Sequence, residues 1–281
     1  MSFMAGTNRL IGLFLDVFRQ MGRWRIWLWL LSYFALQWLL LEAHRQFTSQ
    51  FLFGIMSAWT GLFGEQEAIG FTHYPGHFLL LPYFFEWAKL YLGLIVEGLF
   101  LGAASLLFYE SYVQVAEEDR FKARQLWSRW IHLVLVYALL NIILIAASMG
   151  LTAALSEWLR YGPRRVLFFE WVILPSLFVF IVAWLLALVP SVVIYRDNAL
   201  QALRRSLRLF LANPITCLVI AACVLTGPIV VSGISGNPTR IVELFKPELV
   251  YWVMVAGLAL DMIVHFIWMG VVVRLLVAEE E

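Results

Sequence analysis

Long apolar runs separated by short polar segments make up most of this chain. A helix that crosses about 30 Å of hydrocarbon needs about 20 predominantly apolar residues, and six runs meet that length. The predicted spans are residues 24–42, 83–112, 131–155, 168–195, 214–234 and 249–276. The longer runs are consistent with helices that tilt within the bilayer or extend past its surface. The pattern predicts an all-α, polytopic membrane protein forming a single integral membrane domain over residues 1–281.

Two further segments have the periodicity of amphipathic helices that lie in a membrane interface. Between residues 7 and 20, Leu10, Phe14 and Val17 share one helical face while charged residues take the other. In Asn198–Asn213, four leucines and Phe210 form a stripe about 100° wide with basic residues beside it. These basic residues, the candidate contacts for anionic lipid headgroups, are Arg204, Arg205 and Arg208.

The longest predicted outer loop covers residues 43–81. Its aromatic and glycine content indicates a surface-lying helix near residues 51–63, followed by an irregular stretch. The loop is too short for a separate domain.

Composition supports the membrane assignment and narrows the possible partners. The chain is 62% hydrophobic and 14% charged, with a mean hydropathy of +0.83, far from the averages of soluble domains. The net charge of +1 offers no field that would capture nucleic acid. The two cysteines, Cys217 and Cys223, lie in one apolar run and exclude a disulfide framework.

The distribution of basic residues predicts the orientation. Thirteen of the 20 Lys and Arg residues fall on the side of the chain ends and of the second and fourth loops. Because basic residues are enriched in cytoplasmic loops, both termini are expected in the cytoplasm.

The segment that contains the second amphipathic helix resembles a known family. Over residues 189–225 a span with Pro190 near its end leads to Ala202–Ser206 (ALRRS), Arg208 and Asn213. This layout is similar to the YciC-like six-span bacterial inner-membrane proteins and to the membrane domain associated with some glycerophosphodiester phosphodiesterases. The resemblance implies a helical bundle in the bacterial inner membrane with an envelope- or lipid-associated role. It implies no catalytic residues.

Ionisable residues within the apolar runs are the main functional candidates, because charged groups at bilayer depth are costly. In the second span Glu86, Lys89 and Glu97 share a face about 80° wide with the small residues Gly93 and Ala104. The sixth span carries Asp261 and His265 on one face, and the third carries Asn141.

Depth predicts how these residues pair. At 1.5 Å per residue, Glu97 and His265 each lie about 20–24 Å below the outer boundary, and Lys89 and Asp261 lie above them. We therefore expect the second and sixth spans to be neighbours, with Glu97 facing His265 and Lys89 reaching Asp261. The cluster is interpreted as an interhelical contact, with a proton or substrate pathway or a catalytic role as the alternatives.

Catalytic and metal-binding patterns are scarce in the sequence. His73 and His77 lie four residues apart, but Pro75 and Gly76 oppose the helix that would align their imidazoles. No zinc-protease, nucleotide-binding or esterase motif occurs. No cofactor, metal or catalytic residue is predicted, and the chain is interpreted as a non-enzyme.

The leading hypothesis is a non-enzymatic protein of the bacterial inner membrane that organises the membrane or envelope, or is a membrane subunit of an assembly. The alternatives are a transporter or permease with an intramembrane acid and base pathway, including an exporter half, and an intramembrane lipid enzyme. The expected partners are the bilayer and anionic headgroups at its cytoplasmic face. A homo-oligomer and other membrane subunits are the alternatives for protein partners.

Overall fold

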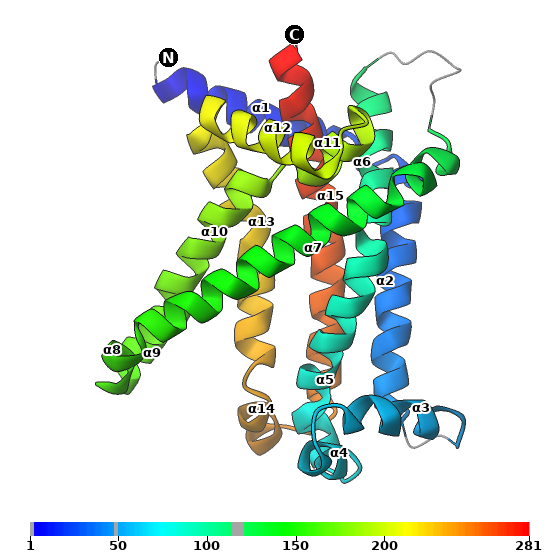
Figure 1. Cartoon of the computed structure of the whole chain (residues 1–281), viewed down its shortest axis with the longest axis vertical. Coiled ribbons are helices and arrows are strands. Elements are labelled where there is room, and N and C mark those ends of the chain that lie inside the picture. Colours follow the sequence, from blue (N-terminus) through cyan, green and yellow to red (C-terminus); the bar gives the residue numbers. More distant parts are fainter. Residues whose placement is uncertain (1–2, 48–49, 114–120, 281) are drawn as a thin grey trace. The chain divides into compact units, whose positions relative to one another are not determined.

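The described part of the chain is helical almost throughout (Figure 1). The structure is a computed structural model that describes residues 3–47, 50–113 and 121–280. No strand occurs among these residues, which confirms the predicted all-α class. Part of the basic loop expected between the second and third spans, residues 114–120, lies outside the described residues.

Six helical segments within the described ranges are long and apolar enough to cross a membrane, as predicted. They are α2 (Trp24–Arg45), the segment Gly76–Tyr112, α7 (Ala123–Ala154), the segment Pro163–Ile194, α13 (Pro214–Ser235) and α15 (Leu249–Glu280). Gly76–Tyr112 consists of α5 (Gly76–Leu92), the π-helical turn η1 (Gly93–Glu97) and α6 (Gly98–Tyr112). Pro163–Ile194 consists of α9 (Pro163–Phe168), the π-helical turn η3 (Phe169–Ile173), α10 (Leu174–Leu185) and α11 (Leu188–Ile194).

The remaining helices are short or lie outside the spans. They are α1 (Phe3–Arg19), α3 (Gln50–Gly61), α4 (Glu65–Phe71), α8 (Ser156–Arg160), α12 (Ala199–Ala212) and α14 (Pro238–Leu244). The two predicted amphipathic helices correspond to α1 and α12, and the predicted surface helix corresponds to α3. The expected irregular stretch after it is wrong, because α4 is helical and α5 already begins at Gly76.

Contacts between Cα atoms divide the chain into two compact units. Unit 1 comprises residues 1–30, 94–226 and 264–281, and unit 2 comprises residues 31–93 and 227–263. Helices α2, α13 and α15 contribute residues to both units. The single integral membrane domain stays a prediction.

Within unit 1, α6 packs closely against α7 because its glycines carry no side chain. A Cβ at Gly98 would lie 3.1 Å from the Leu133 Cβ and 3.4 Å from the Leu133 carbonyl oxygen. Elsewhere in unit 1 aromatic rings pack together: Phe266 stacks on Trp27 at 4.4 Å and meets Phe108 edge-on at 5.0 Å. Small residues at helix contacts allow this approach, which dispersion forces then stabilise.

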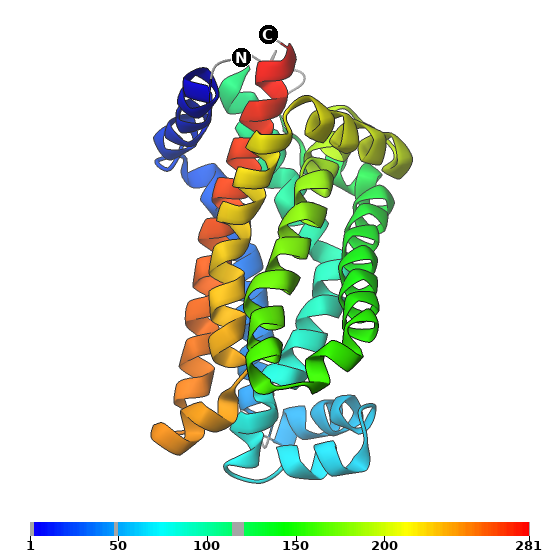
Figure 2. The same ribbon diagram turned by 90° about the vertical axis from the view of Figure 1, so that its left-hand side faces the viewer.

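Helix α1 is fixed to the end of α15 within unit 1. Arg9 contacts Glu279 at 2.8 Å, and Arg274 donates to Asp16 at 3.0 Å. Helix α1 and the C-terminal end of α15 therefore lie at the same end of this unit (Figure 2). An even number of spans requires the two ends of the chain to lie on the same side of the membrane.

Helix α12 lies crosswise to α10 (Figure 2) and starts at a capping box. The Asn198 side chain accepts from the Gln201 N–H at 2.9 Å, and the Gln201 side chain accepts from the Asn198 N–H at 3.0 Å. On its buried face, the Ser206 hydroxyl donates to the Trp184 carbonyl at 2.8 Å and accepts from the Ala187 N–H at 3.1 Å. Ser206 thus satisfies two backbone groups at the break between α10 and α11.

The predicted apolar stripe of α12 is divided between two environments. Leu200, Leu207 and Leu211 are exposed, whereas Phe210 of the same stripe is buried together with Leu209. One apolar face of α12 therefore packs against the protein, and a second apolar face is exposed.

Unit 2 has a core rich in phenylalanine. The largest fully buried side chains here include Phe71, Phe84 and Phe85, which pack with Met254 and Leu258 of α15. The aromatic rings connect α4, α5 and α15 in one apolar cluster.

The contact at Gly98 gives a test of the packing in unit 1. Replacing Gly98 with Leu places a side chain against the Leu133 backbone, which cannot yield as a flexible side chain would. We expect this substitution to lower the free energy of unfolding by about 1–3 kcal/mol, measured by thermal melting in detergent. Gly150→Leu in α7 is the matched control, because nothing lies within 4 Å of a Cβ there. Equal losses in both variants would contradict the close packing.

Candidate functional site

The ionisable residues predicted within the second and sixth spans form two complementary pairs, one in each unit. In unit 1 the His265 Nε2 lies 3.2 Å from the Glu97 Oε1, and both side chains are largely buried, at 15% and 8% exposure. In unit 2 the Lys89 Nζ donates to the Asp261 Oδ2 at 2.8 Å. Both predicted pairings, each between the second span and α15, are confirmed.

A π-helical turn positions Glu97 at the end of η1. Such a turn departs from the regular hydrogen-bond pattern of an α-helix. The Trp130 indole N–H donates to the Ile95 carbonyl of this turn at 2.8 Å. This bond joins α7 to the turn that ends in Glu97.

A small cavity of about 70 Å³ adjoins the Lys89–Asp261 pair in unit 2. Its polar lining includes Glu86, Ser232 and Ser235 besides the pair itself. A buried water has a share of about 30 Å³ in the liquid, so the space suits one or two waters. It is far smaller than ligand pockets of about 300–1,000 Å³.

Two predicted members of the cluster lie outside the two pairs. Glu86 is exposed, but it lines the same cavity as Lys89 and Asp261. Asn141 is half-buried in α7 and donates to the Tyr137 carbonyl of its own helix at 2.9 Å. This bond satisfies the amide within the helix and links it to no neighbour.

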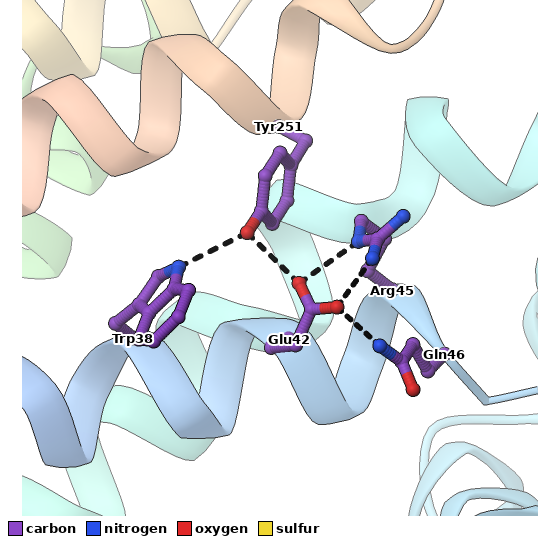
Figure 3. Close-up of polar contacts among 5 residues, drawn as sticks. All are labelled: Trp38, Glu42, Arg45, Gln46 and Tyr251. Carbon is purple, nitrogen blue, oxygen red and sulfur yellow. Dashed lines mark hydrogen bonds and ion pairs between the residues drawn. The ribbon is translucent and has the colours of Figure 1, made fainter.

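The sequence did not single out a third polar cluster, which centres on Glu42 in unit 2 (Figure 3). The Tyr251 hydroxyl donates to Glu42 at 2.8 Å and accepts from the Trp38 indole at 3.0 Å. Arg45 and Gln46 donate to the same carboxylate. The spacing of Glu42 and Arg45 signals a local helical pair, but nothing local points to Tyr251.

The cluster forms one wall of a cavity of about 550 Å³. Trp38, Tyr251 and Trp252 contribute aromatic surface to the lining, and Glu42 and Arg45 contribute charge. The Arg45 guanidinium also lies 5.2 Å from the centre of the Tyr251 ring, a cation–π distance.

The two outer histidines have different environments. The His77 ring is buried against the rings of Phe71 at 4.5 Å and Phe47 at 4.7 Å, whereas His73 is exposed. His77 is therefore part of the aromatic core of unit 2. No group of three or more potential metal ligands occurs in the described ranges.

The three arginines of α12 divide into two kinds. Arg204 and Arg208 are exposed, beside the exposed leucines. Arg205 donates to Asp197 at 2.7 Å and lies 3.8 Å above the centre of the Tyr195 ring. The hydrogen bond to Asp197 raises the pKa of Arg205, and burial raises the pKa of the Tyr195 hydroxyl. Arg205 is committed to a contact within the protein, while lipid contact by all three arginines stays a prediction.

The fold and the paired residues define a multi-pass helical membrane protein. Searches of protein-family models, curated proteins and solved structures give no match to the chain. The resemblance to YciC-like proteins therefore stays a prediction.

The Lys89–Asp261 pair can be tested by a double-mutant cycle. Lys89→Ala leaves a carboxylate within the span without this cation, so we expect a loss of about 3–5 kcal/mol in the free energy of unfolding. Asp261→Ala should cost a similar amount, and the double variant should lose much less than the sum. Unfolding in detergent followed by circular dichroism measures all four proteins. Additive losses would show that the two residues are not coupled.

Proposed function

We propose that the chain is a non-enzymatic protein of the bacterial inner membrane that organises the membrane or envelope, or serves as a membrane subunit of an assembly. The observation that carries the proposal is the pairing of Glu97 with His265 and of Lys89 with Asp261. Complementary groups at contact distance provide interhelical cohesion. A homo-oligomer and other membrane subunits both remain candidate partners.

The outer surface of α12 supports a further part of the proposal, contact with anionic lipid. Its exposed leucines suit the acyl region, and the exposed Arg204 and Arg208 suit phosphates beside them. Each basic residue near an anionic surface contributes about 1 kcal/mol of attraction. In the predicted orientation this leaflet is the cytoplasmic one.

One observation favours the alternative, a transporter or permease with a proton pathway. The cavity beside Lys89 and Asp261 has a polar lining and room for one or two waters. The cavity has room for waters that conduct protons, but it is too small for an organic solute. The two functions therefore differ in proton movement.

Neutral variants separate these functions. If the pairs are structural, Glu97→Gln and Asp261→Asn each lose a charge-assisted contact worth about 1.5–3 kcal/mol, which lowers the melting temperature in detergent. Proton flux into proteoliposomes, reported by a trapped pH-sensitive dye, should equal that of protein-free vesicles for all variants. Flux through the wild-type protein that both variants abolish without a change in melting temperature would establish the transporter.

The predicted orientation has a separate test. We expect green fluorescent protein to fluoresce when fused to the C-terminus, because a cytoplasmic location permits its folding. Alkaline phosphatase fused at the same point should be inactive in intact cells. The reverse pattern would place the termini outside the cytoplasm.

A further inference from the structure

A basic cavity of unit 1 lies between the end of α6, the start of α7 and the connection from α11 to α12. Its volume is about 760 Å³, within the usual range for ligand pockets. Four basic residues line it, namely Lys122, Arg124, Arg129 and Arg196. The acid in the described lining is Glu110, whose carboxylate accepts a hydrogen bond from the Phe121 backbone N–H.

Arg196 is held at this cavity by an uncommon backbone conformation. Its φ of 58° lies in the left-handed region, which costs free energy for a residue other than glycine. The residues on both sides are fixed by one side chain: Arg205 lies over the Tyr195 ring at 3.8 Å and donates to Asp197 at 2.7 Å. These contacts maintain the turn, and Arg196 remains part of the cavity wall.

Helix α7 adds to the positive potential. It is 32 residues long, and its N-terminus, with Lys122 as the N-cap, borders the cavity. The partial positive charge of a helix N-terminus favours anions, and phosphate groups bind at such ends. Arg124 and Arg129 follow on the first two turns, so the helix end and its side chains act together.

The uncharged part of the lining is mixed. Val113, Phe121 and Val193 contribute hydrophobic surface beside the basic residues, and Gln125 and Ser128 contribute polar groups. Trp127, on the turn of α7 between Arg124 and Arg129, is 66% exposed, as tryptophans at a membrane interface commonly are. Basic groups beside this hydrophobic surface match a phosphate joined to an acyl chain.

We propose that this cavity binds the phosphate group of an anionic ligand, and that the ligand is a membrane phospholipid. Arginine suits this role because its planar guanidinium can give two parallel hydrogen bonds to phosphate oxygens. The site goes beyond the proposed function, since it involves neither intramembrane pair and is distinct from the outer surface of α12.

The test compares two double variants that each remove two arginines. Arg129→Gln with Arg196→Asn removes charge from the cavity, and Asn tolerates the left-handed backbone. Arg160→Gln with Arg164→Gln removes equal charge from exposed positions of α8 and α9, to which no binding role is assigned. Purified full-length proteins in neutral detergent are titrated with dioctanoyl phosphatidylglycerol, dioctanoyl phosphatidylcholine and glycerol 3-phosphate, and binding is followed by native mass spectrometry. An unchanged elution volume and melting temperature without lipid confirm folding.

We expect phosphatidylglycerol to bind at least about tenfold more tightly than phosphatidylcholine, and the cavity variant to lose about tenfold or more of that affinity. The Arg160 and Arg164 variant should change by less than about twofold. Equal losses in both variants, or equal affinity for the two lipids, would overturn the site. Glycerol 3-phosphate binding as tightly as the lipid would overturn the lipid assignment in favour of a soluble phosphate compound. None of these outcomes depends on proton flux or on the stability of the paired residues.

Discussion

The constraint on which this structure depends is that polar groups within a bilayer must find partners inside the protein. It governs side chains, as Lys89 and Asp261 or Glu97 and His265 show. It governs the backbone equally. The Ser206 hydroxyl bonds two backbone groups at the break between α10 and α11, and the Trp130 indole donates to a carbonyl of the π-helical turn Gly93–Glu97. Irregular helix geometry is tolerated where a neighbouring segment supplies the missing hydrogen bond.

This constraint explains which features the sequence could predict. The number of spans follows from local composition, because the thickness of the hydrocarbon sets the length of each apolar run. The two polar pairs were predictable because few ionisable groups lie at bilayer depth, and a helix rises by a fixed 1.5 Å per residue. Depth and sign left Lys89 and His265 few alternatives to Asp261 and Glu97.

Features that depend on tertiary geometry were not predictable in this way. A uniform 100° per residue takes no account of the extra residue in the turn Gly93–Glu97, so phases calculated across it are displaced by about 100°. The exposure of Glu86 depends on which neighbours cover α5. Tyr251 reaches Glu42 across 209 positions of sequence, and Asp197 binds Arg205 because the chain turns at Arg196. The hydrophobic periodicity of the sequence carries no information about such long-range contacts.

The length of α7 has a consequence for the membrane itself. Its 32 residues correspond to about 48 Å, against about 30 Å of hydrocarbon, and Figure 1 shows it running obliquely past α6. A thicker bilayer favours a steeper helix and a thinner one a shallower helix. Helix α7 carries Arg124 and Arg129 at one end and places Trp130 against the π-helical turn. A change in bilayer thickness that alters the tilt of α7 therefore shifts the two cavity arginines and the Trp130 contact together.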